Sequence, residues 1–335
     1  MKDFEYVNLG KDYGPTGNVR QFSRELDKRV LRATSGQLGG YHIAADIPMV
    51  EGTSGIFMGA QNPDGRLVAV KLGVSSNRRA QEYAVREAAF QARVAHETGA
   101  VPDVFEVDTV HVEADVKRDG GTNHVEGDFP LIAMEYVPGE TMARTLYRRP
   151  IRDPQSARER LSGVAAAVDA MGETGVVHMD IKPANTIERE RDGKTDSVVI
   201  DFDTSVEADT ILDEACGSAG SIAPEQVPQP TTVASTKINI WQFGSLAYAS
   251  MTGEPFVLAK DTWRENGYLT GDAYNDYHKR RITRSGLHVP LQGVFLKAGA
   301  LTPSDRYDTG TELLDGLVKA LETPETTIID LHERA

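Results

Sequence analysis

Cysteine is almost absent from this chain of 335 residues, in which Cys216 is the single example. One thiol cannot form an internal disulfide framework, and it cannot build a cysteine-based metal cluster. The sequence therefore predicts a protein of a reducing compartment. We interpret Cys216 as a small residue in a loop in preference to a reactive thiol.

Long apolar runs are also missing. No stretch approaches the roughly 18 apolar residues that a membrane-spanning helix needs. The first residues, Met1 to Glu5, lack the basic and then apolar build of a secretion signal. The sequence therefore predicts a cytoplasmic protein with no membrane span.

Basic side chains are few relative to acidic ones: 36 Lys and Arg stand against 50 Asp and Glu, for a formal net charge of −14. Such a surface repels nucleic acids and anionic membranes, so we expect neither as a partner. Basic protein segments are the partners that this surface would tolerate best.

The remaining composition, 40% hydrophobic and 26% charged, is ordinary for a soluble globular protein. Residues 1 to about 40 differ because they are polar and rich in glycine, with one short helix predicted from Gln21 to Arg32. We expect this extension either to dock on the main body or to stay mobile.

Strand-like runs broken by turns follow from Tyr41 to Leu72. The turn sequence Asn62 to Gly65 is a strong hairpin signal, so two antiparallel strands should flank it. Lys71 ends the second of these strands. A lone Lys at this place is usually a solvated strand end, so its interpretation depends on a partner.

Residues 79 to 98 show helical spacing, with Tyr83, Phe90 and Val94 on one apolar stripe. Glu87 lies on the same stripe. An unpaired buried charge is costly, so an acidic residue on an inward face needs a cation. Glu87 is therefore the predicted partner of Lys71, and a partly exposed Glu at the stripe's edge is the alternative.

Two further strands are predicted at Val104 to Val112 and Pro130 to Val137, separated by a flexible, protruding loop that includes residues 115–121. A helix is predicted from Asp153 to Gly175, because Pro154 suits its first turn. That helix leads the chain into Val176 and the central motif.

The central motif is the run from His178 to Asn185. It places Asp180, a Lys two residues later and an Asn five residues later after a short apolar run. A second acidic residue, Asp201, ends the next strand-like run. Such a set is typical of sites that handle phosphate and Mg²⁺.

Lys71, Glu87, the run from His178 to Asn185, and Asp201 with Phe202 resemble the protein kinase family in order and spacing. The Lys182-Pro183 pair resembles the Ser/Thr class. The sequence as a whole, including the run from Ala223 to Gln226, is similar to eukaryotic-like kinases of bacteria. The resemblance covers about Tyr41 to Leu321.

The later part of the chain adds to this resemblance. Residues 217–225, which close in Ala223-Pro224-Glu225, are similar to the end of a kinase activation segment. The run 301–306 is similar to the segment whose Arg pairs with that glutamate, so we predict an ion pair between Glu225 and Arg306. Residues 236–252 should form a buried central helix that ends at Gly253.

The resemblance implies an α+β fold with two lobes, a small antiparallel sheet with one helix and a larger, mainly helical lobe. It divides the chain into an N-terminal extension, an N-lobe, a C-lobe and a polar tail, at residues 1–40, 41–137, 138–322 and 323–335.

It also implies ATP and Mg²⁺ as cofactors, with Mn²⁺ as a substitute ion, and Ser/Thr hydroxyls of protein substrates as acceptors. Asp180 would orient the acceptor, Lys182 would contact the γ-phosphate, and Asn185 with Asp201 would ligate the metal through oxygen.

The remaining site residues are implied in the same way. Lys71 would pair with the α- and β-phosphates, and Glu87 would hold that lysine. The other implied nucleotide contacts are the loop glycines Gly52 and Gly55, the gatekeeper Met134, the hinge residues Glu135 and Val137, and the adenine-packing pair Ala69 and Ile187.

Four positions depart from the family pattern. Val50 replaces the first loop glycine, Met179 stands where many kinases have a phosphate-clamping Arg, Asp203 replaces a Gly, and Asn239 replaces an Asp that supports the catalytic loop. We expect a stiffer loop, less dependence on phosphorylation, a restricted backbone at Asp203 and weaker support by Asn239.

Two alternatives remain open. Asp203 and the missing Arg also suit a small-molecule kinase of related fold, against which the Lys182-Pro183 pair and the run 217–225 argue. A pseudokinase or scaffold would bind nucleotide without turnover, and the intact charged set argues against it. Candidate autophosphorylation sites are Thr204, Ser205, Thr210, Ser218 and Ser221. The physiological substrate, the activating signal and the oligomeric state do not follow from the sequence.

Overall fold

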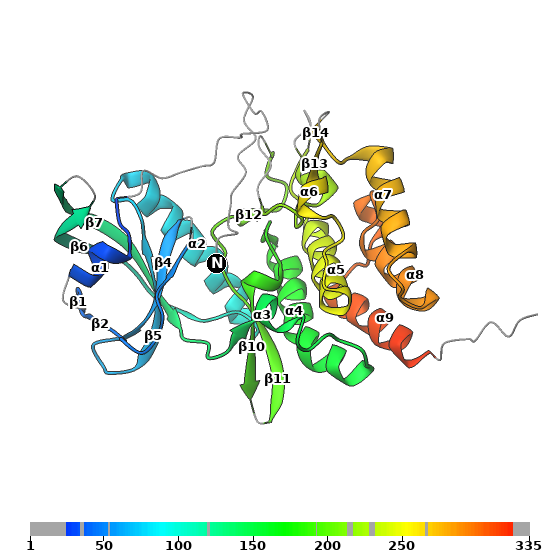
Figure 1. Cartoon of the computed structure of the whole chain (residues 1–335), viewed down its shortest axis with the longest axis horizontal. Helices are drawn as coiled ribbons and strands as arrows, with labels where there is room; N and C mark the ends of the chain where they lie inside the picture. The colour runs from blue at the N-terminus through cyan, green and yellow to red at the C-terminus, as the bar shows by residue number, and fades with distance from the viewer. Residues whose placement is uncertain are drawn as a thin grey trace, which may run out of the picture.

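The computed structural model describes residues 25–33, 37–52, 54–118, 121–191, 193–212, 217–227, 232–264 and 267–323. Cys216, most of the glycine-rich extension and residues 324–335 of the C-terminal tail lie outside these residues. The described chain forms a smaller β-rich lobe and a larger, mainly helical lobe, which lie side by side in Figure 1. Among the described helices, none has both the length and the apolar character that crossing a bilayer requires.

The smaller lobe is built on a seven-stranded antiparallel sheet with the order β1-β2-β4-β5-β7-β6, in which β3 pairs with β4. Its core is a cluster of buried hydrophobic side chains, most of them aliphatic, to which β4 and β5 contribute. The strands are β1 (Gln37–Leu38), β2 (Tyr41–Ile43), β3 (Val50–Glu51), β4 (Gly55–Gln61), β5 (Leu67–Gly73), β6 (Val104–Arg118) and β7 (Gly121–Glu135).

The predicted hairpin at Asn62 to Gly65 is confirmed, since β4 and β5 pair across it. Asn62 anchors the turn by accepting backbone hydrogen bonds on its side chain from Asp64 and Arg66. Gly65 has a φ of 77°, in the left-handed region that glycine adopts without steric cost. The turn therefore fixes the register that brings Lys71 to its place in β5.

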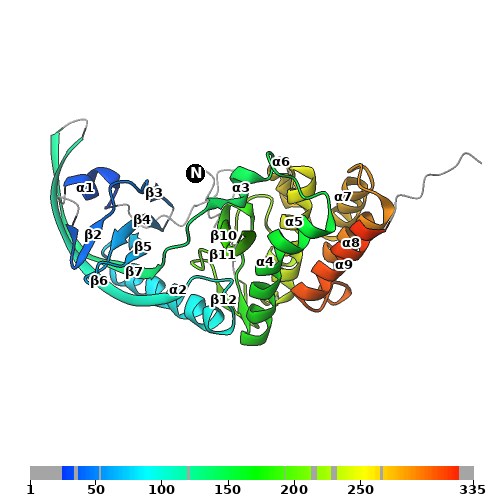
Figure 2. The same ribbon diagram turned by 90° about the horizontal axis from the view of Figure 1, so that it is seen from below.

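The prediction of a flexible loop around residues 115–121 is wrong. β6 and β7 stay paired up to Arg118 and Gly121 and form one long ribbon, which curves around the lobe in Figure 2. Val112, Ala114 and Val116 are buried and alternate with exposed charged residues. This alternation is the two-residue period of a strand, and the high density of charges on the exposed face concealed it.

The described part of the N-terminal extension docks on the smaller lobe. Helix α1 (Lys28–Ala33) and the residues before it bury Leu26, Val30 and Leu31 completely. The carboxylate of Glu25 accepts hydrogen bonds from the hydroxyls of Ser75 and Ser76 at 2.9 and 2.6 Å. Of the two expectations for the extension, docking holds for residues 25–33.

Helix α2 (Arg78–Glu97) lies between the two lobes. Asn77 caps its N-terminus by accepting a hydrogen bond from the backbone of Ala80 at 2.8 Å. Phe90 and Val94 join the core of the larger lobe, whereas Ala88 packs with side chains of the sheet. The helix therefore holds Glu87 at the boundary of the lobes.

The described part of the larger lobe contains five small strands beside the site and a helical body. The elements near the site are β8 (Glu140–Thr141), α3 (Met142–Thr145), α4 (Pro154–Thr174), β9 (Val176–Val177), β10 (Thr186–Arg191), β11 (Lys194–Val199) and β12 (Val206–Glu207). Asp153 caps α4 by accepting the backbone N–H of Ser156 at 2.9 Å. Gly175 ends it in the left-handed conformation, with a φ of 68°.

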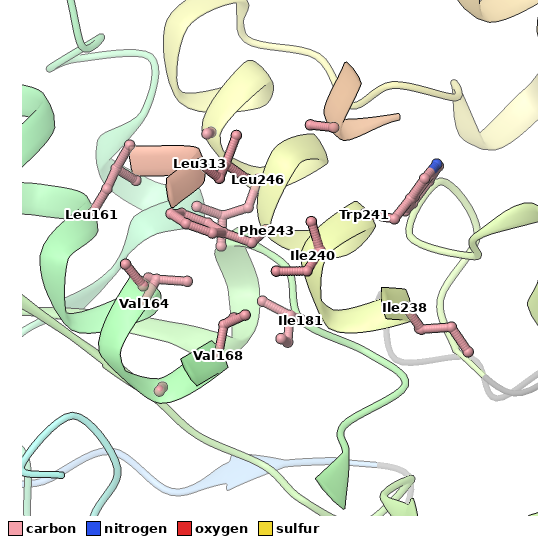
Figure 3. Packing of buried hydrophobic residues seen from close by; sticks show 14 of the residues in the cluster. Leu161, Val164, Val168, Ile181, Ile238, Ile240, Trp241, Phe243, Leu246 and Leu313 are labelled. Carbon is pink, nitrogen blue, oxygen red and sulfur yellow. The ribbon is translucent and has the colours of Figure 1, made fainter. Parts of the chain in front are cut away.

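The helical body surrounds α5 (Lys237–Thr252), in which every residue from Ile238 to Ser250 is buried. This confirms the predicted central helix and its stop at Gly253, which has a φ of 85°. Figure 3 shows side chains of α4 and α5 packed around Ile181 of the central motif. The outer elements are α6 (Ala259–Thr262), β13 (Trp263–Arg264), β14 (Gly267–Tyr268), α7 (Gly271–Thr283), α8 (Val289–Ala298) and α9 (Gly310–Glu322).

Candidate active site

The predicted ion pair between β5 and α2 is confirmed. Lys71 Nζ lies 2.7 and 2.8 Å from the two carboxylate oxygens of Glu87, and both side chains are buried. Burial by itself would lower the pKa of Lys71, but Glu87 and Asp201 outweigh it and raise that pKa. Burial raises the pKa of Glu87, yet two short contacts with an ammonium favour its ionised form. The lysine therefore stays charged.

Lys71 also contacts the two aspartates that follow β11. Its Nζ lies 3.2 Å from Asp201 Oδ1 and 3.5 Å from Asp203 Oδ2. Three carboxylates thus surround one ammonium group. The excess negative charge makes this position a good one for an additional cation.

The central motif forms a tight loop after β9. Lys182 Nζ lies 2.9 Å from Asp180 Oδ2, and Asn185 Nδ2 donates to the backbone oxygen of Asp180 at 3.0 Å. His178 is buried, and burial lowers its pKa. Its Nδ1 accepts from the backbone of Asp180, and its Nε2 donates to Ile200. The neutral imidazole therefore has a structural role beneath Asp180.

Ser218 completes this loop from a distant segment. Its backbone N–H donates to Asp180 Oδ1 at 2.9 Å, its hydroxyl lies 3.1 Å from Asp180 Oδ2, and Lys182 Nζ also contacts that hydroxyl. From the sequence alone, Ser218 was predicted only as a candidate autophosphorylation site. Its place after Gly217, in the run that closes at Glu225, was the available signal for this contact.

The other candidate autophosphorylation sites differ in accessibility. Thr204, Ser205 and Ser221 are buried, whereas Thr210 is partly exposed. The hydroxyl of Thr204 donates to the backbone oxygen of His178 at 2.9 Å. In this arrangement Thr210 is therefore the most accessible of the predicted acceptors.

The backbone conformation of Asp203 differs from the restriction that the sequence led us to expect. Its φ is not positive; among the described non-glycine residues, only Met179, Asp201 and Asp209 have positive φ. The expected backbone restriction therefore falls on Asp201, with a φ of 71°. Burial raises the pKa of Asp203 to about 7, although the nearby Lys71 favours the ionised form.

The glycine-rich turn between β3 and β4 closes onto Asp203. Ser54 Oγ donates to Asp203 Oδ2 at 2.7 Å, and Gly52 N donates to Gly55 O at 2.8 Å. A Cβ atom at Gly55 would lie 2.9 Å from Lys71 Cγ. Glycine at this position therefore allows the turn to approach Lys71 closely.

The residues implied for the adenine lie where the lobes join. Ala69 pairs with Met134 across β5 and β7, and Met134 is buried. Glu135 N donates to Asp103 O at 2.8 Å. Val137 is buried just beyond β7, and Ile187 is half-buried on β10 of the larger lobe. A Cβ atom at Gly139 would lie 3.0 Å from Ile187, so this side chain borders the connection between the lobes.

Asn239 and the pair of Glu225 and Arg306 were both assigned structural roles from the sequence. Asn239 Oδ1 accepts from His178 N at 3.0 Å, and its Nδ2 donates to Val176 O at 2.9 Å. Asn239 therefore holds the loop through two hydrogen bonds but without a charge. The predicted pair of Glu225 and Arg306 is confirmed: Arg306 Nη2 lies 2.8 Å from Glu225 Oε2, and Nη1 contacts Oε1.

A divalent cation fits the oxygen atoms of this site. Asn185 Oδ1 is buried and has no hydrogen-bond partner, although a buried polar atom is normally satisfied. Its amide nitrogen donates to Asp180, so its oxygen can coordinate a ligand. Amide and carboxylate oxygens are the ligands that Mg²⁺ prefers, so Asn185 and Asp201 suit such an ion.

Comparisons with known proteins agree with this geometry. The profile of the protein kinase domain matches residues 51–280. The serine/threonine-protein kinase PknB of Mycobacterium tuberculosis is 29% identical over 209 residues, which cover 58% of this chain and 30% of that protein. A probable serine/threonine-protein kinase PknB of Corynebacterium glutamicum is 28% identical over 278 residues, which cover 78% and 39%. The chain thus matches about a third of the length of these relatives.

Solved structures give the same fold. The crystal structure of the PknI kinase domain of Mycobacterium tuberculosis, a double mutant, superposes with a TM-score of 0.57 and 19% sequence identity. The match covers 86% of this chain and 98% of that domain. The predicted α+β fold with two lobes is confirmed.

Proposed function

Because the chain belongs to the protein kinase family, we propose that it transfers the γ-phosphoryl group of ATP to Ser and Thr hydroxyls of protein substrates. One observation carries the proposal: Asp180, Lys182 and Ser218 converge within hydrogen-bond distance in a buried loop. A carboxylate beside an ammonium group is the arrangement that an incoming hydroxyl and a transferring phosphoryl group require.

Each residue of the loop has a role in this proposal. Asp180 accepts the hydrogen bond of the attacking hydroxyl and orients its oxygen toward the phosphorus. Lys182 offsets the negative charge on the γ-phosphoryl oxygens, and Ser218 holds both side chains in register. Positioning and charge compensation supply most of the rate enhancement in phosphoryl transfer.

The nucleotide is held from both lobes. Lys71 binds the α- and β-phosphates and is itself positioned by Glu87, while the turn with Gly52 and Gly55 covers the phosphates. The adenine lies between Ala69 and Ile187, beside Met134, with backbone groups of Glu135 and Val137 on its edge.

Protein kinases generally use ATP with a divalent metal ion, and we assign Mg²⁺ here, with Mn²⁺ as a substitute. Asn185 and Asp201 would hold the ion through oxygen. When bound, it neutralises charge on the phosphates. The unpartnered oxygen of Asn185 supports this assignment.

A protein acceptor is favoured over a small molecule because residues 217–227 are packed against the catalytic loop. In this proposal that segment presents the acceptor peptide to Asp180. The intact set of charged side chains also favours turnover over a scaffold that only binds nucleotide. We further propose a cytoplasmic protein whose substrates carry basic segments, which the net charge of −14 would attract.

We propose a functional division of the chain into an extension at 1–40, an N-lobe at 41–137, a C-lobe at 138–322 and a tail at 323–335. A boundary near residue 137 is supported by the element order, because β7 ends at Glu135 and β8 begins at Glu140. The sheet itself begins earlier, at Gln37, and residues 25–33 pack on it. Residues 25–33 of the extension therefore support the N-lobe structurally.

Intact-mass spectrometry before and after incubation with ATP and Mg²⁺ tests the proposal. We expect the wild-type protein to gain 80 Da increments on itself or on an added basic protein, since each phosphoryl transfer adds roughly that mass. Asp180→Asn should gain none while keeping its circular dichroism spectrum and melting temperature. Asp276→Asn, at an exposed carboxylate of α7, is the matched control. Transfer at the wild-type rate by Asp180→Asn would refute the assigned role.

A further inference from the structure

Gln242 of α5 holds the backbone on both sides of Asp180. Its Nε2 donates to Met179 O at 2.7 Å, and its Oε1 accepts from Ile181 N at 2.9 Å. These two groups flank the catalytic aspartate. One amide side chain thus fixes the residue before Asp180 and the residue after it.

The orientation of this amide is unambiguous. A backbone N–H can only donate and a backbone carbonyl can only accept. Ile181 N therefore requires the oxygen of Gln242, and Met179 O requires its nitrogen. A flipped amide would leave both backbone groups facing a like partner in a buried place.

Gln226 connects the same carbonyl to the segment that follows Ser218. Its Nε2 donates to Met179 O at 2.8 Å, and its Oε1 accepts from Ala223 N at 2.8 Å. Gln242 Nε2 also lies 3.0 Å from Ser221 O and 3.1 Å from Gln226 Oε1. The two glutamines therefore join the catalytic loop and residues 217–227 into one hydrogen-bonded unit.

This unit lies fully inside the protein, since Gln226, Gln242 and Met179 have no exposed surface. Met179 has a φ of 71°, a conformation that costs energy for a residue with a side chain. Its carbonyl receives both amide donors, which uses the two lone pairs of that oxygen. The amide pair therefore stabilises the strained backbone directly before Asp180.

The unit carries no net charge. A cluster of arginines that orders a segment needs a phosphate to balance its charge. Two neutral amides with satisfied donors and acceptors need no counter-ion, and Met179 places an apolar side chain beside them. Their hydrogen bonds therefore form in the unmodified protein, without phosphorylation.

We infer that Gln242 is a positioning residue for Asp180, and that Gln226 couples this position to residues 217–227 without any phosphate on the segment. The inference rests on the proposed function, because it concerns the regulation of the same site. It predicts an enzyme that is competent before any phosphorylation.

The test uses Gln242→Met, which keeps the length of the side chain and removes its hydrogen bonds. We expect kcat to fall roughly ten- to a hundredfold, as for a small displacement of a catalytic group, while KM for ATP stays within about twofold. Ser245→Ala is the matched control, because Ser245 is buried on the same helix and accepts a hydrogen bond from Phe256 N, away from the loop. It should lose comparable stability and keep its kcat.

Hydrogen exchange gives a readout that is independent of catalysis. In phosphate-free protein, the amides of Ile181 and Ala223 should be protected, and Gln242→Met should speed the exchange of Ile181 at least tenfold. Gln226→Met serves as a second variant if the first does not fold, and it should speed the exchange of Ala223. Unchanged exchange in both variants would overturn the inference even if the protein has no kinase activity.

Progress curves test whether the enzyme is active before it is phosphorylated. Phosphatase-treated protein, checked by intact mass, should phosphorylate its substrate from the first turnover with no lag. A lag that disappears after preincubation with ATP would overturn this part of the inference while supporting the proposed kinase activity. Wild-type kcat in Gln242→Met would also overturn it and leave the proposed function intact.

Discussion

Removing the carboxylate of Asp203 should tighten nucleotide binding. Asp203 Oδ2 accepts a hydrogen bond from Ser54 Oγ at 2.7 Å and lies 3.5 Å from Lys71 Nζ. A nucleotide whose phosphates contact Lys71 and the glycine-rich turn must compete with this carboxylate for both groups. The contact therefore opposes nucleotide entry.

The magnitude follows from the hydrogen bond that must break. A hydrogen bond to a charged group contributes about 1.5–3 kcal/mol. Recovering the lower value in Asp203→Gly gives about tenfold tighter binding, since 1.4 kcal/mol corresponds to a factor of roughly ten. Asp203→Asn keeps an acceptor oxygen for Ser54 and loses the charge, so its gain should be smaller.

Equilibrium titration with a fluorescent ATP analogue at fixed Mg²⁺ measures the effect, with Asp276→Asn as the control. Ser54→Ala should tighten binding in the wild-type background and have no further effect in Asp203→Gly, because the two residues share one hydrogen bond. Weaker nucleotide binding by Asp203→Gly would refute the reasoning. It would mean that the carboxylate helps to hold the metal and nucleotide.

Three further predictions concern other contacts. Ser218→Ala should lower kcat roughly tenfold in a steady-state assay with little change in KM for ATP, because it removes the hydroxyl that hydrogen-bonds both Asp180 and Lys182; an unchanged kcat would count against those contacts. Arg306→Met should lower the free energy of unfolding by about 3 kcal/mol in calorimetry, because it leaves the half-buried carboxylate of Glu225, whose side chain is only 14% exposed, without its cation. A loss below about 1 kcal/mol would contradict this. Burial lowers the pKa of His278 to about 4, so the unfolded state binds more protons between that pH and about 6.5. The contribution of neutral His278 to the free energy of unfolding is therefore fully present above the pKa of the unfolded state, and it should fall by about 3 kcal/mol as the pH drops through this window. In urea titrations at several pH values, His278→Gln should make the free energy of unfolding less dependent on pH.

The helices of the larger lobe could be predicted because their signals are local. Pro154 and Gly175 mark the ends of α4, and the continuous apolar character of residues 238–250 indicates a buried helix. The inner parts of β6 and β7 were predicted, but the outer part of the ribbon was missed because its alternation is diluted by charges such as Glu113 and Asp115 on the exposed face. Charges on a solvated strand face carry little information on pairing, which depends on the partner strand.

The sequence by itself determined which chemical groups are present: Lys71, Glu87, Asp180, Asn185 and Asp201 lie in runs whose spacing indicates phosphate chemistry. It also indicated two ion pairs: an inward-facing Glu87 needs a cation, and the resemblance of the run 301–306 implied the pair of Glu225 and Arg306.

Only the tertiary structure decided how the site is held together. Ser54 contacts Asp203 across 149 positions of the chain, Gln242 contacts Met179 across 63, and Ser218 contacts Asp180 across 38. The position of a Ser or Gln is not marked by hydrophobic periodicity, and its side chain carries no charge that requires one particular partner. Its hydrogen bonds therefore depend on which backbone groups the fold buries beside it. These neutral partners hold the catalytic loop in place, and the charged residues define its chemistry.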